Sequence, residues 1–278
     1  MSLKLMYITN RMDVAKIADE NGVDRIFIDM EYIGKEARQG GLDSVKSFHT
    51  VDDVKNVRGV LKNAELLVRV NPIHGATDSY CSSKEEIDAV VMAGADVIML
   101  PMAKTVSEVE DFVKFVGKRT RTMLLLETKE AADKIEEMLS LGGIDEVHIG
   151  LNDLHLAKGK KFMFELLCDG TVENLCEKIK KFGVPYGFGG IARLGYGMLP
   201  AEHVITEHYR LGSKMAILSR SFCNIDKASG LEEIEKTFKY EMEKIRSFEG
   251  TVSSYTAEQF EANRVATACL VKKIVERV

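Results

Sequence analysis

The sequence predicts an α/β fold, a (β/α)8 or TIM barrel with appended C-terminal helices. Eight short apolar runs recur over about 220 residues, the length of such a barrel. Each run is continuous rather than alternating, as in strands buried on both faces of a parallel sheet. Amphipathic stretches separate the runs and supply the helices. A doubly wound sheet has the same alternation, so the polar residues that follow the runs must decide between the two folds.

Local signals justify the elements in chain order. Capping boxes open two helices, at Ser83-Lys84-Glu85-Glu86 and Thr105-Val106-Ser107-Glu108, and glycines end several others. The predicted strands span 4–9, 25–30, 66–70, 97–100, 122–126, 147–151, 185–188 and 215–218. The other predicted helices span 12–21, 130–141, 171–182 and 200–211.

The pattern changes after Gly230, so we predict a catalytic barrel domain over 1–229 and a helical extension over 230–278. Two helices are expected there, at 231–248 and 256–278, joined by a polar linker at 249–255. The second carries an apolar stripe that needs a partner surface, on the barrel or on another subunit. We favour a subunit contact and expect a homo-oligomer. The stripe consists of Ala266, Leu270, Val271, Ile274 and Val275.

Composition excludes several functional classes. The net charge of -5 is dispersed, and no basic stripe indicates a nucleic-acid partner. No apolar run reaches the roughly 18 residues of a membrane span, and the N-terminus lacks the pattern of a secretory leader. Five scattered cysteines without a CxxC pair favour a reducing compartment over a disulfide scaffold. We therefore expect a soluble cytoplasmic protein.

Polar residues follow several runs, at the end of the barrel where active sites lie. Glu127 and Asp153 follow neighbouring runs, so their strands should lie about 4.8 Å apart. Two carboxylates with positions left for water and substrate suit a hard ion such as Mg²⁺ or Mn²⁺. The plainer interpretation is a helix cap or turn, which is favoured for Asp153 or Thr128 taken alone.

Arg69 lies inside an otherwise apolar strand and needs an anion there. Its planar guanidinium suits a carboxylate, a phosphate or a developing enolate oxygen. The structural alternative is an ion pair with Asp29 or Glu31, which follow the second run.

Five segments, in order and at similar spacing, resemble those of the HpcH/HpaI aldolase and citrate lyase β-subunit family. Residues 124–131, LLLETKEA, resemble its IET-x-E/G-A signature, and residues 148–154, HIGLNDL, resemble its F-x-G-x-x-D-L segment. Each segment alone is weak, but five in register over roughly residues 5–222 are specific. The other three segments lie at 27–31, 68–71 and 93–102.

The resemblance implies a metal-dependent carbon–carbon lyase of the aldolase type, a barrel of the phosphoenolpyruvate/pyruvate superfamily. Its substrates would be a pyruvate-like 2-oxoacid and an aldehyde or acyl partner, reacting through a metal-stabilised enolate. Glu127 and Asp153 would hold Mg²⁺ or Mn²⁺, and Arg69 would bind the oxoacid. Asp29 and Glu31 would support the metal waters or Arg69. Backbone N–H groups around Asn152 and Asp153 would bind the substrate carboxylate.

Tyr32 departs from the family, which has His in the aldolase branch and Asp in the citrate lyase branch at this position. The general base is therefore open between Asp29, a Tyr32 phenolate and His155, although a packing role is favoured for a lone histidine. A citrate-lyase-like acyl-CoA lyase stays an alternative, because residues 35–38, KEAR, resemble that branch more closely.

Three sequence features suggest other functions, and each is weaker than the resemblance described above. Residues 187–192 match the dinucleotide pattern G-x-G-x-x-A, but no helix follows directly, so a loop over the barrel mouth is expected. Arg193 in that loop is a candidate for a phosphate or second carboxylate, with plain solvent exposure as the alternative. Lys104 raises Schiff-base aldolase chemistry, for which an exposed lysine is poorly suited. A non-catalytic barrel that serves as a binding module is the remaining alternative.

Overall fold

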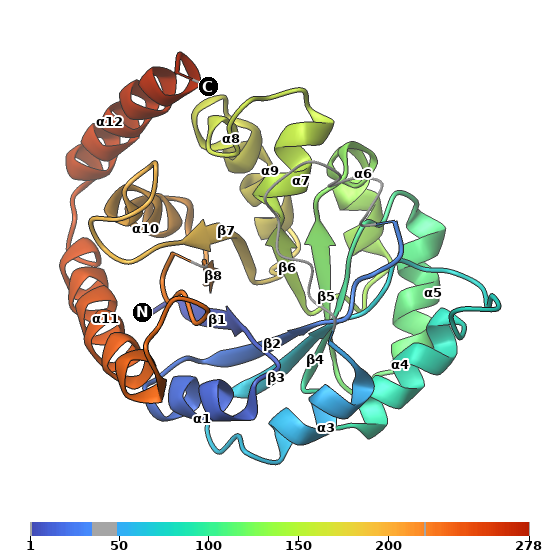
Figure 1. The fold of residues 1–278 in the computed structure, drawn as a ribbon. Helices are drawn as coiled ribbons and strands as arrows, with labels where there is room; N and C mark the ends of the chain where they lie inside the picture. Colours follow the sequence, from blue (N-terminus) through green and yellow to red (C-terminus); the bar gives the residue numbers. More distant parts are fainter. Residues whose placement is uncertain (1, 35–48, 220, 278) are drawn as a thin grey trace.

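A closed barrel of eight parallel strands forms the centre of the molecule (Figure 1). The computed structural model describes residues 2–34, 49–219 and 221–277. Neighbours in the sequence are neighbours in the sheet, and β8 pairs with β1 to close it. This arrangement confirms the predicted (β/α)8 fold. The strands are β1 (Lys4–Ile8), β2 (Arg25–Asp29), β3 (Glu65–Arg69), β4 (Val97–Leu100), β5 (Arg121–Leu126), β6 (Glu146–Ile149), β7 (Tyr186–Ile191) and β8 (Met215–Leu218).

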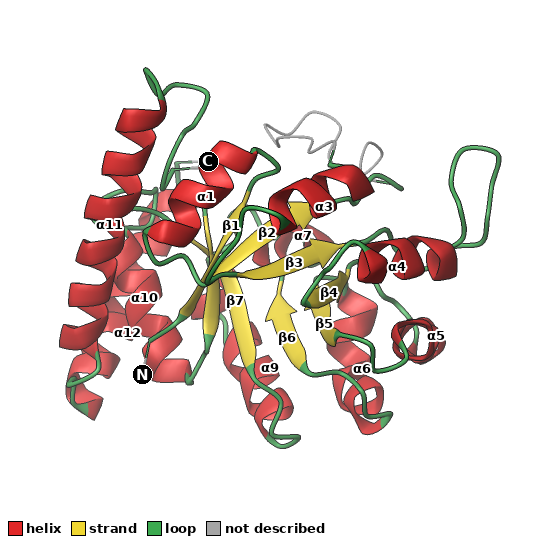
Figure 2. Ribbon diagram, turned by 90° about the horizontal axis from the view of Figure 1, so that it is seen from below, coloured by secondary structure: helices red, strands yellow, loops and turns green. Residues whose placement is uncertain are grey.

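Helices surround the strands on the outside of the barrel (Figure 2). Three of them, α3, α7 and α8, lie outside the helical spans predicted from the sequence. The described helices are α1 (Met12–Glu20), α3 (Val51–Arg58), α4 (Ser83–Met92), α5 (Val106–Val116), α6 (Lys129–Ser140), α7 (Leu151–Ala157), α8 (Glu165–Cys168), α9 (Thr171–Lys180), α10 (Ala201–Leu211), α11 (Leu231–Val252) and α12 (Ala257–Val275).

The capping boxes show where the sequence signals were accurate. Thr105 caps α5 with Glu108 as predicted, by reciprocal hydrogen bonds between side chains and backbone amides. The box of α4 lies one residue earlier than predicted, between Ser82 and Glu85. Glu86 does not close a box because its carboxylate is buried and accepts hydrogen bonds from Asn71.

The barrel interior is closed at the N-terminal end of the strands by charged side chains. Arg25 is fully buried there, with its guanidinium 2.7 Å from Glu65 and 2.8 Å from Glu146. Above this layer the interior is largely apolar, with Phe27 and Met123 among the side chains that fill it. The polar residues expected to act on a ligand therefore lie at the opposite, C-terminal end of the strands.

The C-terminal helices pack on the chain's own barrel, α11 against α1 and α10, and α12 against α10 and α8 (Figure 1). Within the predicted stripe Val271 is buried, whereas Ala266 is exposed. The predicted linker at 249–255 is wrong in its first part, because α11 continues to Val252. Glu249 is buried there and accepts a hydrogen bond from the Leu3 amide at 2.7 Å. The expected homo-oligomer stays a prediction.

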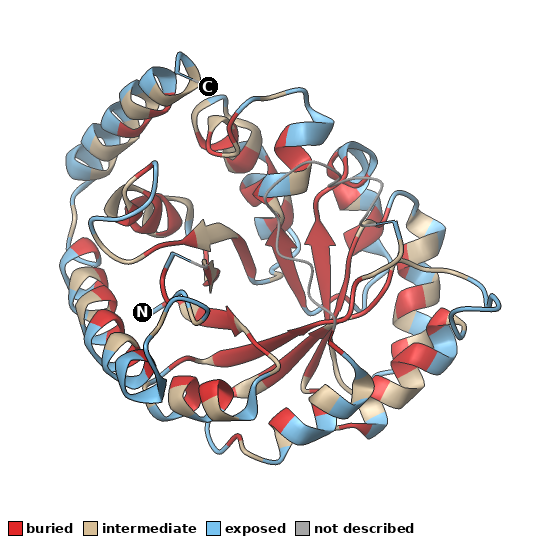
Figure 3. Ribbon diagram, in the orientation of Figure 1, coloured by how far each residue is buried: buried red, intermediate tan, exposed pale blue. Residues whose placement is uncertain are grey.

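Burial follows the barrel geometry, with buried residues on the strands and on the inward faces of the helices (Figure 3). The five cysteines are all free thiols. Within the described ranges no helix combines the length and apolarity that crossing a membrane requires.

Candidate functional site

Glu127 stands directly after β5 at the mouth of the barrel and is 3% exposed. Its Oε1 accepts a hydrogen bond from the Met102 amide at 3.1 Å. Met102 follows β4 and adopts a left-handed backbone conformation, with φ of 54°. A non-glycine residue in this region is strained, and such strain is often retained at functional sites. The loop after β4 thus presents a backbone donor to the carboxylate that ends β5.

Gly150 leaves room for this carboxylate at the end of β6. A Cβ atom at Gly150 would lie 2.8 Å from Glu127 Cβ and 3.0 Å from Glu127 Oε2. Both contacts are closer than ordinary packing permits. Thr128, next in the chain, caps α6 as the plainer interpretation predicted, and its hydroxyl also donates to the Ala103 carbonyl.

Asp153 joins Glu127 on the wall of one cavity of about 420 Å³. Burial raises the pKa of Glu127 to about 8, and the negative charges of Asp153 and Glu31 add to the increase. Asp153 is the third residue of α7 and does not cap that helix; Gly150 holds the cap position without a side-chain hydrogen bond. The cavity is lined by Met102, Lys104, Glu127, Thr128, Lys129, Glu130, Asp153, Leu156 and Ala157.

Arg69 ends β3 and is held by two carboxylates. Its Nε and Nη2 both donate to Asp29, each at 2.8 Å, and Nη1 lies 3.3 Å from Glu31. Burial disfavours the charged guanidinium, but Asp29 and Glu31 outweigh that effect and raise the pKa of Arg69. The ion pair foreseen as the structural alternative therefore exists. Three of the five N–H groups of Arg69 face these carboxylates, which within the described residues leaves two for a ligand.

The candidate bases of the loop after β2 are engaged in other contacts. The Tyr32 hydroxyl donates to the His49 carbonyl, and burial together with Asp29 raises the pKa of Tyr32 to about 12. The phenolate is therefore scarce at neutral pH. His49 accepts a hydrogen bond from the Asp29 amide at 3.0 Å. Residues 35–38, which resemble the citrate lyase branch, lie outside the described residues.

The remaining predicted residues lie apart from the Glu127 contacts. His155 is buried in α7, where its Nδ1 lies 3.1 Å from the Leu151 carbonyl, so it has the expected packing role. Asn152 is exposed in the first turn of α7. Arg193 donates to the Ser221 carbonyl at 3.2 Å, and its guanidinium lies 4.6 Å from the centre of the Tyr196 ring.

One contributor was not foreseen as part of the site, Met102, which lines the cavity and donates to Glu127. No sequence signal marks the left-handed conformation of Met102.

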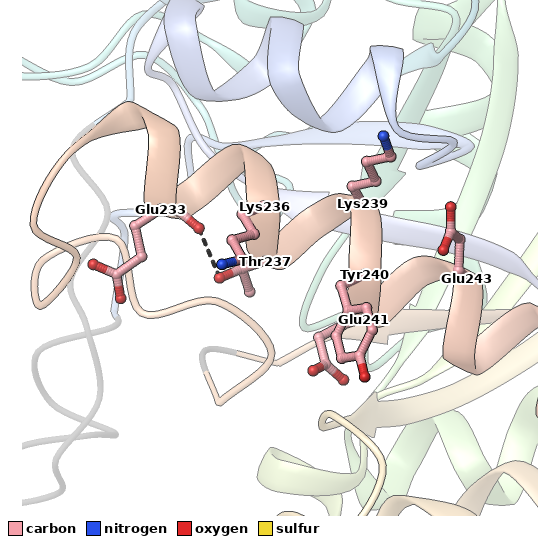
Figure 4. Close-up of a pocket in the computed structure, with 7 residues that line it drawn as sticks. All are labelled: Glu233, Lys236, Thr237, Lys239, Tyr240, Glu241 and Glu243. Carbon is pink, nitrogen blue, oxygen red and sulfur yellow. Dashed lines mark hydrogen bonds between the residues drawn. The ribbon is translucent and has the colours of Figure 1, made fainter.

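A second hollow follows the outer face of α11 (Figure 4). It is lined by residues of that helix, among them Lys236 and Tyr240, and contains none of the predicted site residues. Among the residues that the structure describes, no group of three or more His, Cys, Asp or Glu side chains forms a metal cluster. The Glu127 cavity thus remains the place where the predicted carboxylates meet.

Comparison with known proteins finds solved structures of the same fold. One solved structure, an HpcH/HpaI aldolase/citrate lyase family protein from Burkholderia cenocepacia J2315, has a TM-score of 0.62 at 14% identity, over 84% of this chain and 94% of that one. Another, an HpcH/HpaI aldolase from Desulfitobacterium hafniense DCB-2, has a TM-score of 0.58 at 17% identity, over 78% of this chain and 86% of that one. These two similarities establish the fold alone.

No curated protein matches the chain in sequence. The family model for HpcH/HpaI aldolase/citrate lyase, however, matches residues 4–163, which is more than half of the chain and includes Arg69, Glu127 and Asp153. The family comprises aldolases and lyases, so an enzyme of the lyase class is indicated. The chain belongs to the HpcH/HpaI aldolase/citrate lyase family.

Proposed function

We propose that this protein is a divalent-metal-dependent carbon–carbon lyase that acts on a 2-oxoacid such as pyruvate or on its aldol adduct. The observation that carries the proposal is the shared cavity of Glu127 and Asp153, in which burial and the neighbouring acidic groups raise the pKa of Glu127. A cation in this cavity would offset the cost of a buried, ionised carboxylate.

The donor set fits Mg²⁺ or Mn²⁺. Both carboxylates are hard oxygen donors, and magnesium commonly takes one or two carboxylates while keeping water and substrate oxygens. Gly150, directly after β6, places no side chain against Oε2 of Glu127. When bound, such an ion would supply Lewis-acid stabilisation to the oxygens of a 2-oxoacid.

The residues of the chain would bind and orient the substrate. Asp29 and Glu31 hold the Arg69 guanidinium in a fixed, charged state, because the bidentate pair with Asp29 restricts its rotation. The remaining N–H groups of Arg69 suit the carboxylate or the carbonyl oxygen of the oxoacid, where negative charge develops as an enolate forms. The Asn152 and Asp153 amides and Arg193 stay secondary candidates for substrate contact.

A Schiff-base aldolase is the second candidate, because Lys104 also lines the cavity. Lys104 is exposed, however, so it lacks the apolar surroundings that activate a nucleophilic lysine. Trapping pyruvate on the protein with borohydride would establish the Schiff base. A chelator-sensitive reaction that Mg²⁺ or Mn²⁺ restores, with no trapped adduct, would support the metal-dependent reaction instead.

The direct test is exchange of the pyruvate methyl protons with deuterium in D₂O, followed by proton NMR with Mn²⁺ removed before detection or with Mg²⁺ throughout. We expect exchange by the parent protein and loss of at least about a hundredfold in Glu127→Gln and Asp153→Asn, since each substitution removes a charged ligand. Glu130→Gln is the matched control, because Glu130 lines the same cavity but is exposed. Absence of exchange in the parent protein refutes the enolate chemistry.

A further inference from the structure

Two isoleucines of the barrel interior reach solvent at the mouth, one on β8 and one on β1. Met215 of β8 and Met6 of β1 are buried in the apolar interior of the barrel. Side chains alternate along a strand, so Ile217 and Ile8, two residues further on, also point inward. Both pack on the interior side chains, but both are only half-buried. Solvent therefore reaches the barrel interior along β8 and β1, which pair with each other.

Other strands are covered near their C-terminal ends. Asp29 at the end of β2 is 2% exposed, Met99 of β4 is 0% exposed and Glu127 after β5 is 3% exposed. Because the strands follow sequence order around the closed barrel, β8 and β1 lie across the mouth from β4 and β5 (Figure 1). The half-buried isoleucines thus form an apolar wall opposite the Glu127 carboxylate. We call Ile8 and Ile217 the isoleucine wall.

The polar groups beside the isoleucine wall bond to one another. Ser219 follows Ile217 on the inward face of the chain, and its hydroxyl lies 2.7 Å from the Ser221 hydroxyl. Arg193 donates to the Ser221 carbonyl at 3.2 Å and stacks on Tyr196. What the wall offers to a ligand is therefore carbon surface, and apolar side chains in a binding site usually contact the hydrocarbon part of a ligand.

The isoleucine wall lies where the second reactant of the proposed reaction is needed. Arg69 ends β3 with its side chain 14% exposed, so it too reaches solvent at the mouth. A 2-oxoacid held by Arg69 on β3 and by the carboxylates after β5 and β6 occupies that side of the mouth. The molecule that reacts with its methyl carbon must then approach from the remaining side, which β8 and β1 form.

We propose that the isoleucine wall binds the hydrocarbon chain of the second reactant, and that this reactant is an aliphatic aldehyde with a short apolar chain. The proposal rests on the proposed function and names the partner class that it leaves open. The enolate carbon of pyruvate forms a bond to the aldehyde carbon, the electron pair of the aldehyde C=O bond moves to oxygen, and that oxygen takes up a proton from solvent. Ile8 and Ile217 contact the chain alone and determine specificity.

An aldehyde series at saturating pyruvate with Mg²⁺ tests the proposal. Each CH₂ group placed on the isoleucine wall should raise kcat/KM about threefold, or about tenfold from acetaldehyde through propanal to butanal. The charged comparison is 4-oxobutanoate, which carries a carboxylate in place of the terminal methyl group of butanal and should react more slowly. A kcat/KM that does not rise with chain length overturns the proposal. A preference for 4-oxobutanoate also overturns it and favours Arg193 as the contact.

Two substitutions assign the preference to the wall. Ile8→Thr and Ile217→Thr keep the branched shape but replace carbon with a hydroxyl group. We expect the ratio of kcat/KM for butanal to that for acetaldehyde to fall from about tenfold to about threefold or less in each. Ile17→Thr is the matched control, because Ile17 is a half-buried isoleucine of α1, outside the barrel interior. A packing role alone would lower both rates and leave the ratio unchanged, and that result overturns the proposal.

Methyl NMR of the parent protein supplies a test that needs no turnover. With ¹³C in the isoleucine δ1 methyl groups, butyramide serves as an unreactive analogue of butanal, and acetamide is its control without the chain. We expect butyramide to shift the methyl signals of Ile8 and Ile217 but not that of Ile17, and acetamide to shift none of them. If the parent does not exchange the pyruvate methyl protons, the proposed function fails, and these shifts alone decide whether the wall binds an apolar chain. Unshifted Ile8 and Ile217 signals overturn the proposal.

Discussion

Acid should destabilise this protein through buried histidines, and His208 allows the effect to be measured. His208 is a residue of α10 that stacks on Phe188 of β7, and its Nδ1 forms a hydrogen bond of 2.7 Å with the Ser213 hydroxyl. Burial lowers its pKa from 6.5 to about 3. The folded state therefore binds fewer protons than the unfolded state between these values. Stability is full above pH 6.5 and is lost as the pH falls below it.

The size of the stability loss follows from the ordinary pKa of 6.5 and the lowered pKa of about 3. At about pH 5 the pH is about 1.5 units below the ordinary pKa, and each unit changes the free energy of unfolding by about 1.4 kcal/mol for one group. His208 should thus remove about 2 kcal/mol of stability between about pH 7.5 and about pH 5. His148, with its pKa lowered to about 4, adds a loss of similar size over the same interval.

The assay is urea unfolding of the parent and of His208→Gln at both pH values. Loss of the stacked ring lowers the stability of the variant at every pH, so the informative quantity is the change between the two pH values. We expect that change to be smaller in His208→Gln by about 2 kcal/mol. Val90→Ala is the control, because it removes buried apolar volume without removing a titratable group. Parallel pH profiles for the parent and His208→Gln would refute the reasoning.

Three further predictions concern the mouth of the barrel. Gly150→Ala should weaken Mn²⁺ binding about tenfold, because the added Cβ would displace the Glu127 carboxylate. Gly75→Ala is the control and should bind Mn²⁺ as the parent does, since its Cβ would meet nothing within 4 Å. Equal Mn²⁺ affinities in the two variants count against a role for Glu127. Arg69→Ala should lower kcat/KM by orders of magnitude with metal binding nearly intact, and a mild kinetic effect would exclude Arg69 from substrate binding. The same substitution should lower the free energy of unfolding in urea by about 3–5 kcal/mol, because Asp29 and Glu31 lose their ion pairs with Arg69. The Mn²⁺ affinity of the parent protein should rise about tenfold per pH unit up to about pH 8 and then level off, since Glu127 must lose its proton before the ion binds. An Mn²⁺ affinity that does not change between about pH 6 and pH 8 contradicts this prediction.

The barrel was predictable because its signals are local. Continuous apolar runs mark strands that are covered on both faces, and the box at Thr105 lies where two reciprocal hydrogen bonds require it. The same local signal misplaced the start of α4, because a tertiary contact between Glu86 and Asn71 competes with the cap. The end of α11 was misplaced for a similar reason, since Glu249 looks like a linker residue but is buried against Arg246 and the Leu3 amide.

The residues proposed for the candidate site were chosen from the sequence, but their geometry could not be predicted from it. Strand-end position was enough to select Glu127, Asp153 and Arg69, because charges at the ends of apolar strands need partners. How firmly Arg69 is held by Asp29 depends on side-chain orientation, which the sequence does not contain. The left-handed conformation of Met102 depends on the path of the loop after β4, and nothing local predicts it.

Calorimetric titration with Mn²⁺ tests the central claim most directly, using two buffers of different ionisation enthalpy near pH 7. The shared cavity of Glu127 and Asp153 predicts one ion bound per chain and release of close to one proton per ion, because the raised pKa of about 8 keeps Glu127 largely protonated beforehand. Glu127→Gln should bind at least about tenfold more weakly and release no proton. Binding of equal strength by the parent, Glu127→Gln and Asp153→Asn would contradict the assignment of the metal site.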